Sequence, residues 1–532
     1  MAKKTGNNKN EINEKQLEKG IENLVEKIKV DLKSQPKNQK IKPLIRIEKT
    51  DEAKSKKELG ITADRDDFSE WFTELMIKAE LADYTDVSGC IVFRPNSYAI
   101  WEKVVSEVDK RFKKLGVQNA YFPLFIPEKL LNKEKDHVKG FSPEVAWVTQ
   151  SGDTPMAERL AVRPTSETIM YPSYAKWVRS WRDLPLKINQ WNNVVRWEFK
   201  HPVPFFRTRE FLWNELHTVS ATEKEALEEG KQIINAYNDV TENIMALHGL
   251  YGRKTESEKF AGAVFSEKVH YIMANGKVLE GCPFHHDGQN FAKAYDIQFL
   301  DKDGKKQYGW QNTYAISTRM LGLMFAIHSD EKGLILPPKI APNPIVIIPI
   351  IFGDTKIKVL AEANKIAEEL KDYNAFVDAR EEYKSGFKFS EWELKGIPLR
   401  IEIGPRDIEK SEVVITRRDT MQKEAIKIKD LKQKIPIILE DIQNSLFKKS
   451  KIIFEERVKK AETLEELKKI IENKKVGISP MCKNEKCEET LKFETKGAKA
   501  LFIDDKNRVK PNQKCIICDN PAEYLLYIGK SY

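Results

Sequence analysis

The sequence predicts an α+β protein in which an antiparallel sheet flanked by helices is followed by two smaller α/β domains. Charged residues alternate along residues 193–199 and 211–218, as in antiparallel strands that expose one face. Beyond residue 344, continuous apolar strands alternate with helices, which is typical of a covered sheet. Four of the six cysteines fall near the C-terminus, so the last domain is expected to hold a metal.

At 532 residues the chain is long enough for two to four domains, and its net charge of +9 is spread unevenly. Residues 1–57 hold sixteen Lys and Arg against nine Asp and Glu, and apolar residues recur at helical spacing over residues 11–33. This basic N-terminal extension is expected to contain one amphipathic helix between polar linkers. Two interpretations stay open: it contacts a polyanion or another protein, or its lysines serve solubility.

No stretch reaches the ~18 consecutive apolar residues of a membrane helix, and the polar start lacks a secretory signal. Six cysteines in a chain of this length also argue against a disulfide framework. We therefore expect a cytoplasmic protein with no membrane association.

The first large region, residues 58–340, mixes helical and strand patterns. Apolar residues recur at helical spacing over residues 100–115, and this helix is expected to end at Gly116. A short apolar strand is expected at residues 120–122. The two charged strands and the loop between them, residues 201–208, are expected to form a sheet that faces a ligand.

The second region, residues 341–440, is expected to be an α/β domain. From about residue 430 a Lys/Glu-rich helical stretch leads into the third region, residues 441–532, which holds the cysteines. The expected strands of the second region are 344–351, 375–378, 398–403 and 412–416, with a helix at 355–371.

Three groups of residues in the first region suit a nucleotide. Arg196 and Glu198 alternate on a predicted strand, so both point to one face, and Phe211 follows the loop where it can stack on a base. The segment from Ser317 to Arg319 opens an expected helix, whose N–H groups suit a phosphate. Guanidinium groups pair with phosphate oxygens bidentately. Each group alone is more common as a structural ion pair or a solvated face, but the three in order favour a nucleotide site.

The helix and strand before Pro123, the hairpin from Arg196 to Phe211 and the segment around Arg319 resemble motifs 1, 2 and 3 of class II aminoacyl-tRNA synthetases. No GxxxxGK[ST] loop occurs, which suits a nucleotide held by side chains on an antiparallel sheet. Over about residues 59–532 the chain is similar to prolyl-tRNA synthetases of the archaeal and eukaryotic type. The matching runs are RPTSET (163–168), NVVRWEFKHP (193–202), RTREFLW (207–213), KTESEKFAG (254–262), HHDGQN (285–290) and EWELKGIPLR (391–400).

The resemblance implies a class II catalytic core in residues 58–340, an anticodon-binding domain in 341–440 and a zinc-binding domain in 441–532. It implies proline–tRNA ligase activity, in which ATP with Mg²⁺ converts L-proline to prolyl-adenylate, pyrophosphate leaves, and the prolyl group passes to the 3′ end of tRNA(Pro). It also implies a homodimer and makes tRNA one candidate partner of the N-terminal extension.

The family's functional residues fall on matching positions of this sequence. Arg196, Glu198 and Arg319 are the implied catalytic residues. The residues implied to contact proline are Thr165, Glu167, Arg196, Trp213 and His285. Those implied to contact ATP are Arg196, Glu198, Arg207, Thr208, Phe211, Glu280, Ser317 and Arg319. Those implied to read the anticodon are Glu393, Arg400 and Arg406, since Arg and Glu suit the edges of unstacked bases.

Three positions depart from the family pattern. Pro283 and Phe284 stand where a small or polar run is usual, and Tyr314 stands where Trp is usual. The fit of proline and adenosine at these positions is left to the structure. For His217 and His286 a structural role is the commoner interpretation.

The four C-terminal cysteines are the strongest metal signal. Cys482-x₄-Cys487 and Cys515-x₂-Cys518 can place four thiolates tetrahedrally around Zn²⁺. With no open ligand position the zinc is expected to be structural, and four free buried thiols are the alternative. The terminal Tyr532 resembles a family C-terminus that reaches the active site.

The stretch between the second and third motifs is too short for the editing insertion of many bacterial relatives, so no editing domain is expected. The pocket alone would reject a slightly smaller amino acid by only ~1–3 kcal/mol, and a separate editing factor stays open. Two rival functions also stay open. One is a neighbouring synthetase specificity such as threonyl, and the other is a catalytically silent paralogue that binds RNA.

Overall fold

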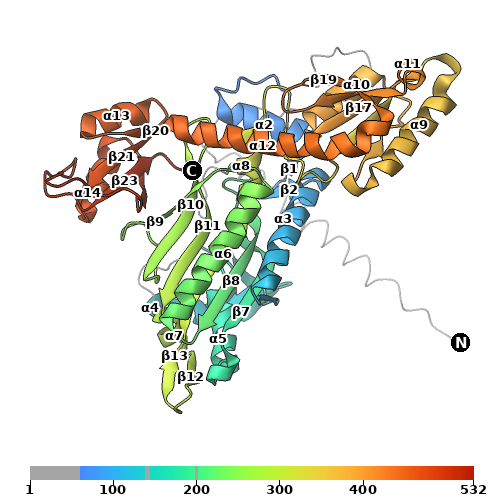
Figure 1. Cartoon of the computed structure of the whole chain (residues 1–532). Coiled ribbons are helices and arrows are strands. Elements are labelled where there is room, and N and C mark those ends of the chain that lie inside the picture. The colour runs from blue at the N-terminus through green and yellow to red at the C-terminus, as the bar shows by residue number, and fades with distance from the viewer. Residues whose placement is uncertain (1–59, 138–143, 198–201) are drawn as a thin grey trace, which may run out of the picture. The chain divides into compact units, whose positions relative to one another are not determined.

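The structure, a computed structural model, describes residues 60–137, 144–197 and 202–532 (Figure 1). The basic N-terminal extension, with the helix expected in it, lies outside these residues, and so does Glu198. Among the described helices, none combines the length and apolar character that a bilayer crossing requires.

An eleven-stranded sheet is the largest element of the described chain (Figure 1). Its central strands, from β9 to β7, pair antiparallel, which confirms the sheet predicted from the alternating pattern. In sheet order the strands are β20 (Val458–Lys460), β21 (Val476–Met481), β23 (Tyr524–Gly529), β22 (Lys499–Ile503), β9 (Leu250–Arg253), β10 (Phe265–Ile272), β11 (Val278–Gly288), β14 (Trp310–Ser317), β8 (Glu210–Ser220), β7 (Leu186–Val195) and β3 (Gln118–Asn119).

Three helices pack together on the central strands: α3 (Pro95–Lys114), α6 (Glu223–Asn243) and α8 (Arg319–His328). A proline in the first turn begins α3, and Gly116, with a φ of +77°, follows its end, as the sequence predicted. In α6, Thr222 and Glu225 cap each other's backbone N–H groups. These local signals set the helix ends.

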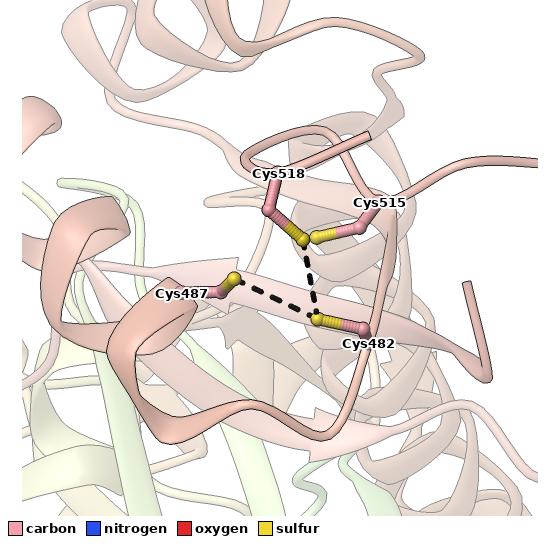
Figure 2. Close-up of side chains that lie close together, drawn as sticks. All are labelled: Cys482, Cys487, Cys515 and Cys518. Atoms are coloured by element: carbon pink, nitrogen blue, oxygen red, sulfur yellow. Dashed lines mark hydrogen bonds between the residues drawn. The ribbon is translucent and has the colours of Figure 1, made fainter. Parts of the chain in front are cut away.

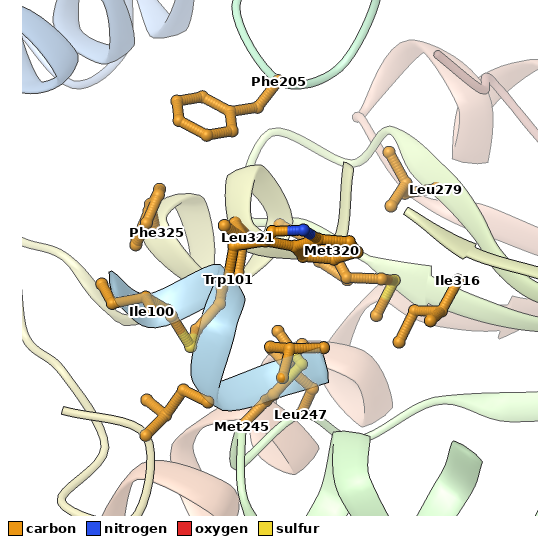
Figure 3. Close-up of a cluster of buried hydrophobic side chains, with 14 of the residues drawn as sticks. Ile100, Trp101, Phe205, Met245, Leu247, Leu279, Ile316, Met320, Leu321 and Phe325 are labelled. Atoms are coloured by element: carbon orange, nitrogen blue, oxygen red, sulfur yellow. The ribbon is translucent and has the colours of Figure 1, made fainter. Parts of the chain in front are cut away.

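The main hydrophobic core lies between these helices and the sheet (Figure 3). Figure 3 shows Trp101 of α3 among Met320, Leu321 and Phe325 of α8. The same core contains Phe205, which lies in the loop between β7 and β8. The loop that carries predicted site residues is therefore anchored in the core.

The strand predicted at residues 120–122 lies two residues earlier, as β3. The Ala120 N–H still donates to the carbonyl of Asn189 at 2.8 Å, but the Phe122 N–H donates to the side chain of Gln190. The ladder ends there because a side-chain amide replaces the backbone acceptor.

The rest of residues 60–340 consists of short elements. They are α2 (Phe68–Lys78), β1 (Ala82–Tyr84), β2 (Ile91–Phe93), β4 (Phe125–Pro127), α4 (Glu128–His137), β5 (Trp147–Ser151), β6 (Thr154–Val162), α5 (Glu167–Trp177), α7 (Asn290–Tyr295), β12 (Gln298–Leu300) and β13 (Lys306–Tyr308). A second core packs α5 and α7 on strands of the large sheet.

The α/β domain contains a five-stranded mixed sheet in the order β16-β15-β17-β18-β19. β15 pairs in parallel with β16 and β17, and the remaining pairs are antiparallel. Its elements are β15 (Ile345–Pro349), α9 (Lys356–Glu369), β16 (Phe376–Val377), α10 (Ser385–Leu394), β17 (Leu399–Ile403), α11 (Pro405–Glu409), β18 (Glu412–Arg417), β19 (Lys423–Lys427) and α12 (Leu431–Arg457).

Helix α12 is continuous across residue 440, where one domain was expected to end. Its first half, including Leu431 and Leu439, packs into the core of the α/β domain. Phe454 near its end packs with the strands of the C-terminal module. One helix therefore serves both cores.

The C-terminal module adds α13 (Leu464–Glu472) and α14 (Glu485–Glu494) to strands β20 to β23. Its β22 pairs with β9 of the first large region, with Ile503 opposite Arg253. The module thus extends the sheet of that region.

Candidate active site

A cavity of about 430 Å³ opens on the face of the sheet formed by β8, β11 and β14. Most of the predicted site residues line it. Arg207 does not, because its side chain is exposed in the loop before β8. The predicted residues that line the cavity are Thr165, Glu167, Arg196, Thr208, Phe211, Trp213, Glu280, His285, Ser317 and Arg319.

Arg196 lies just beyond a strand, not on one as predicted. Strand β7 ends at Val195, and the Arg196 N–H makes one more ladder bond, to the Arg209 carbonyl at 2.7 Å. Pro202 and Pro204 follow in the connecting segment and cannot donate such bonds. The alternation of charges along residues 193–199 could not show that the strand ends at Val195.

The Arg196 guanidinium is held against aromatic rings. Its Nε donates to the Pro164 carbonyl at 3.0 Å, and its carbon lies 5.2 Å from the ring centroid of Trp213 and 5.5 Å from that of Phe211. The two rings meet edge to face. Cation–π contacts and the carbonyl therefore orient the guanidinium.

Arg319 brings a second guanidinium to the cavity at the first residue of α8. Its Nε donates to the Phe206 carbonyl at 3.1 Å, and its N–H approaches the Ser317 hydroxyl at 3.4 Å. Burial, followed by repulsion from Arg196, lowers the pKa of Arg319 to about 10. This end of the cavity is therefore positive, and a polyphosphate would relieve the repulsion.

Glu280 lies between two lysines in the cavity wall. Its carboxylate oxygens accept from Lys254 Nζ at 2.8 Å and Lys268 Nζ at 2.7 Å. Burial alone would raise the pKa of Glu280, but the two ammonium groups outweigh it and hold this pKa well below its ordinary value. Glu280 is therefore a fixed anion.

Thr165 and Glu167 form the acidic end of the cavity. Glu167 is buried as the first residue of α5, and the Thr165 hydroxyl donates to its carboxylate. Carboxylate and hydroxyl face the same space as the aromatic ring of Trp213. This arrangement suits a compact cation with an apolar body.

Glu215 is a site residue that the sequence interpretation missed. It shares a face of β8 with Trp213 and His217 through the two-residue period of a strand, which was the only local signal. Its carboxylate is buried and accepts from the Ser166 N–H at 2.9 Å, the Thr165 hydroxyl at 3.1 Å, Asn192 Nδ2 at 3.0 Å, Gln190 Nε2 at 3.2 Å and the Ser166 hydroxyl.

This carboxylate therefore fixes the backbone and side chain immediately before Glu167. Glu167, Glu215 and His217 each place a donor atom within 4.8 Å of the others, a grouping that could hold a cation. Because Glu215 is already surrounded by hydrogen-bond donors, Glu167 is the carboxylate left to face a ligand.

His285 is held by two residues that the sequence did not single out. Its Nδ1 lies 2.7 Å from the Ser266 hydroxyl, and the Phe260 ring centroid lies 4.6 Å from that of the imidazole. Burial, followed by repulsion from Lys268, places the pKa of His285 well below its ordinary value. The imidazole is therefore neutral at pH 7.

Of the three departures from the family pattern, Pro283 and Tyr314 are among the residues that line the cavity, and Phe284 is not. The rings of Phe284 and Tyr314 stack at 5.2 Å, and the Tyr314 hydroxyl donates to Glu229 of α6 at 3.2 Å. His286 Nδ1 lies 2.8 Å from the side-chain oxygen of Asn312 on β14.

The four C-terminal cysteines converge on one point (Figure 2). Cys482 Sγ lies 3.6 Å from Cys487 Sγ and 3.7 Å from Cys518 Sγ, and all four sulfurs lie within 4.8 Å of one another. Four sulfurs at the Zn–S distance of about 2.3 Å in a tetrahedron would lie ~3.8 Å apart. The donor set and its spacing fit zinc.

Two of the three predicted anticodon residues contact each other. Arg400 Nη1 donates to Glu393 at 2.7 Å, and Nη2 donates to Glu402 at 3.0 Å. The guanidinium is buried over the ring of Phe389. Arg406 is exposed in α11, beyond the end of β17.

Three family models match consecutive parts of the chain. They are described as the tRNA synthetase class II core domain (G, H, P, S and T), at residues 147–328, the anticodon binding domain, at residues 344–436, and the prolyl-tRNA synthetase C-terminal domain, at residues 464–532.

Curated proteins and solved structures match over most of the chain. A proline–tRNA ligase of Natranaerobius thermophilus is 48% identical over 438 residues, covering 82% of this chain and 90% of the relative. A putative proline–tRNA ligase of Saccharomyces cerevisiae is 44% identical and covers 89% of this chain and 73% of the relative. Prolyl-tRNA synthetase from Cryptosporidium parvum with halofuginone and AMPPNP is 44% identical, with a TM-score of 0.85 and coverages of 89% and 100%. The same enzyme with L-proline and AMP is 43% identical, with a TM-score of 0.84 and coverages of 89% and 97%.

Proposed function

The chain belongs to the prolyl-tRNA synthetases and is a proline–tRNA ligase, and we propose that the cavity on β8, β11 and β14 is its active site. The enzyme activates L-proline with ATP and charges tRNA(Pro). The observation that carries the proposal is the polarity of the cavity, which has two part-buried arginines at one end and a carboxylate beside an aromatic wall at the other. A polyphosphate and a cyclic amine would fit these two ends.

In the proposed proline pocket, Glu167 receives the secondary ammonium of proline and the Thr165 hydroxyl orients it. Trp213 forms the apolar wall for the pyrrolidine ring. The neutral imidazole of His285 packs beside the ring without competing for Glu167 as a cation would. The complex of the Cryptosporidium relative with L-proline and AMP supports proline binding by this fold.

In the proposed ATP site, Arg196 contacts the α-phosphate and Arg319 contacts the nucleotide from its far side. ATP enters as its Mg²⁺ complex. The AMPPNP complex of the Cryptosporidium relative supports nucleotide binding by this fold. The remaining proposed contacts are Thr208, Phe211, Glu280 and Ser317 in the cavity wall, exposed Arg207 on the outer phosphates, and Glu198, which lies outside the described residues.

The proposed chemistry needs no general base, because the prolyl carboxylate that attacks the α-phosphorus is already an anion. Arg196 and Arg319 align the two anions and offset the charge that develops as pyrophosphate leaves. A terminal ribose hydroxyl of tRNA then attacks the mixed anhydride and releases AMP.

Beyond the cavity, we propose that Cys482, Cys487, Cys515 and Cys518 hold a structural Zn²⁺, which would fold the loops of the C-terminal module together. The domain boundaries of the sequence analysis are kept, with α12 as the shared connector.

For partners, we propose that Glu393, Arg400 and Arg406 take part in anticodon recognition and that the enzyme is a cytoplasmic homodimer. Arg400 would have to share its guanidinium between Glu393 and a base edge.

The test is amino-acid-dependent ATP–pyrophosphate exchange with all twenty amino acids. We expect exchange with proline to dominate and to disappear in Arg196→Ala. Arg182→Ala, which removes the same charge from an exposed position, should retain it. Exchange with threonine alone would contradict the proline pocket, and tRNA binding without any exchange would favour a silent RNA-binding paralogue.

A further inference from the structure

We propose that Glu488 of the C-terminal module is a positioning residue for the proline pocket and that it transmits the state of the four-cysteine metal site to that pocket. The proposal rests on the proposed function of the cavity. Its physical basis is a segment, residues 254–262, that contacts the cavity with one end and the module with the other.

The end of this segment nearest the cavity holds the wall around His285. Phe260 lies against the imidazole, and its backbone N–H donates to Ser266 Oγ at 2.9 Å. The same Oγ lies 2.7 Å from His285 Nδ1. A shift of the segment would therefore move both the ring that covers His285 and the hydroxyl that orients it.

The other end of the segment contacts Glu488 of the C-terminal module. Glu488 accepts from the Thr255 hydroxyl at 2.9 Å and from the Ser257 hydroxyl. Thr255 is buried, so its hydroxyl has no solvent to replace this acceptor. Lys499 of β22 adds an ion pair to Glu258 at 3.1 Å. All these contacts come from the C-terminal module.

Glu488 also lies next to a metal ligand. It follows Cys487 directly in the first turn of α14, whose start is capped by Asn484. A metal bound to Cys487 would fix this turn and with it the carboxylate. Metal removal would release the turn, because four thiols without a metal have little to hold them together. The affinity for proline should therefore depend on metal occupancy, although none of the four clustered cysteines lines the cavity.

The first experiment compares Glu488→Gln with Glu489→Gln, which changes the neighbouring exposed carboxylate. Proline binding to the full chain is measured by calorimetry, together with zinc content, melting temperature and ATP affinity. We expect Glu488→Gln to raise the Kd for proline roughly tenfold, because hydrogen bonds to an ionised group are replaced by weaker ones to an amide. The other three quantities should stay unchanged, and Glu489→Gln should match the unmodified chain.

The double variant Thr255→Val, Ser257→Ala removes the two donors and should raise the Kd by a similar factor. When the double variant is combined with Glu488→Gln, the Kd for proline should rise by less than about a further twofold, because both changes break the same contact. Removal of zinc by a chelator should weaken proline binding by the unmodified chain. In Glu488→Gln the same treatment should change the Kd for proline by less than about twofold.

An unchanged Kd for proline in a folded Glu488→Gln protein would overturn the proposal. The proposal would also be overturned if Glu488→Gln lowered the proline affinity, the ATP affinity and the melting temperature together, because that result indicates general destabilisation. No proline binding by the unmodified, zinc-loaded chain would instead contradict the proposed function of the cavity, and the coupling with it.

Discussion

At the scale of single residues, two buried glutamates on opposite faces of the sheet show how surroundings decide function. Glu215 faces the cavity and is surrounded by hydrogen-bond donors. Glu229 faces the other side from α6, and burial raises its pKa despite hydrogen bonds from Thr218 and Tyr314. The first carboxylate positions residues of the cavity through its hydrogen bonds, whereas burial of the second favours its neutral form.

We predict that Glu215→Gln lowers kcat/KM for proline by about 10- to 100-fold, because an amide NH₂ would meet the Ser166 N–H and lose a hydrogen bond to a charged group, worth about 1.5–3 kcal/mol. The KM for ATP should change little. Exchange kinetics at varied proline measure this effect. Glu229→Gln is the matched control and should keep the proline KM. Equal behaviour of the two variants would contradict the role of Glu215.

The buried His328 predicts how the free energy of unfolding depends on pH. Burial, followed by repulsion from Lys449, lowers the pKa of His328 to about 3, and its Nε2 bonds to the Met245 carbonyl at 3.0 Å. Between pH 6.5 and 3 the unfolded chain binds a proton at this residue and the folded chain does not. Stability is therefore lost as pH falls below 6.5.

We predict that His328 alone costs the fold about 2 kcal/mol at pH 5 relative to pH 7.5. In His328→Gln, which can still donate to the Met245 carbonyl, the melting temperature should fall less over the same interval. Melting curves at the two pH values measure the difference. Identical pH dependence in both proteins would show that His328 does not remain neutral.

At the scale of elements, the C-terminal module combines a metal site with strands that continue the catalytic sheet. Cys482 follows β21 directly, and β22 pairs with β9. Its packing core contains Cys482, Cys487 and Cys515 themselves. Loss of the metal should therefore loosen this core.

We predict that the purified chain contains one zinc per chain and that Cys515→Ser loses it, with a fall in melting temperature and faster proteolysis after residue 457. Structural zinc contributes on the order of 10 kcal/mol to small domains that depend on it. Cys90→Ser, a change of a cysteine outside the cluster, should retain the metal. Metal analysis decides the outcome, and full zinc content in Cys515→Ser would contradict a four-cysteine site.

At the scale of the whole molecule, the catalytic region, the α/β domain and the C-terminal module are joined by contacts between distant parts of the sequence. Arg418 of the α/β domain is buried and pairs with Asp330 of the catalytic region at 2.6 Å and 2.8 Å. Lys449 of α12 donates to the His328 carbonyl at 2.9 Å. These bonds join the α/β domain and α12 directly to the catalytic region.

We predict that deletion of residues 1–57 leaves proline-dependent exchange unchanged and raises the KM for tRNA, most strongly at low salt. The deleted segment has a net charge of +7, and cations that release counterions from phosphates make binding salt-dependent. Charging assays at about 50 and 200 mM salt measure this. The control is the full chain with the lysines of residues 1–57 replaced by arginine, which keeps the charge and should keep the KM for tRNA. Unchanged tRNA kinetics would favour the solubility interpretation.

Local patterns predicted much of the fold. The end of α3 just before Gly116 follows from backbone preferences of neighbouring residues, and the antiparallel sheet follows from alternation along each strand. The cysteine pairs were recognisable because ligand spacing is itself a local property, and the structure brings their sulfurs together. Arg196, Glu167 and His285 were identified from matching runs, and all three line one cavity.

The sequence by itself thus determined which residue types are present, which segments form helices and strands, and which short runs can carry chemistry. Only the tertiary structure decided that β7 ends before Arg196, that Glu215 orients Thr165, and that Glu488 contacts Thr255 from 233 residues away. The physical reason is range. Backbone preferences and the side-chain period act between near neighbours in the sequence. The partner of a buried carboxylate depends instead on the packing of distant segments, and the sequence of neither segment alone shows that contact.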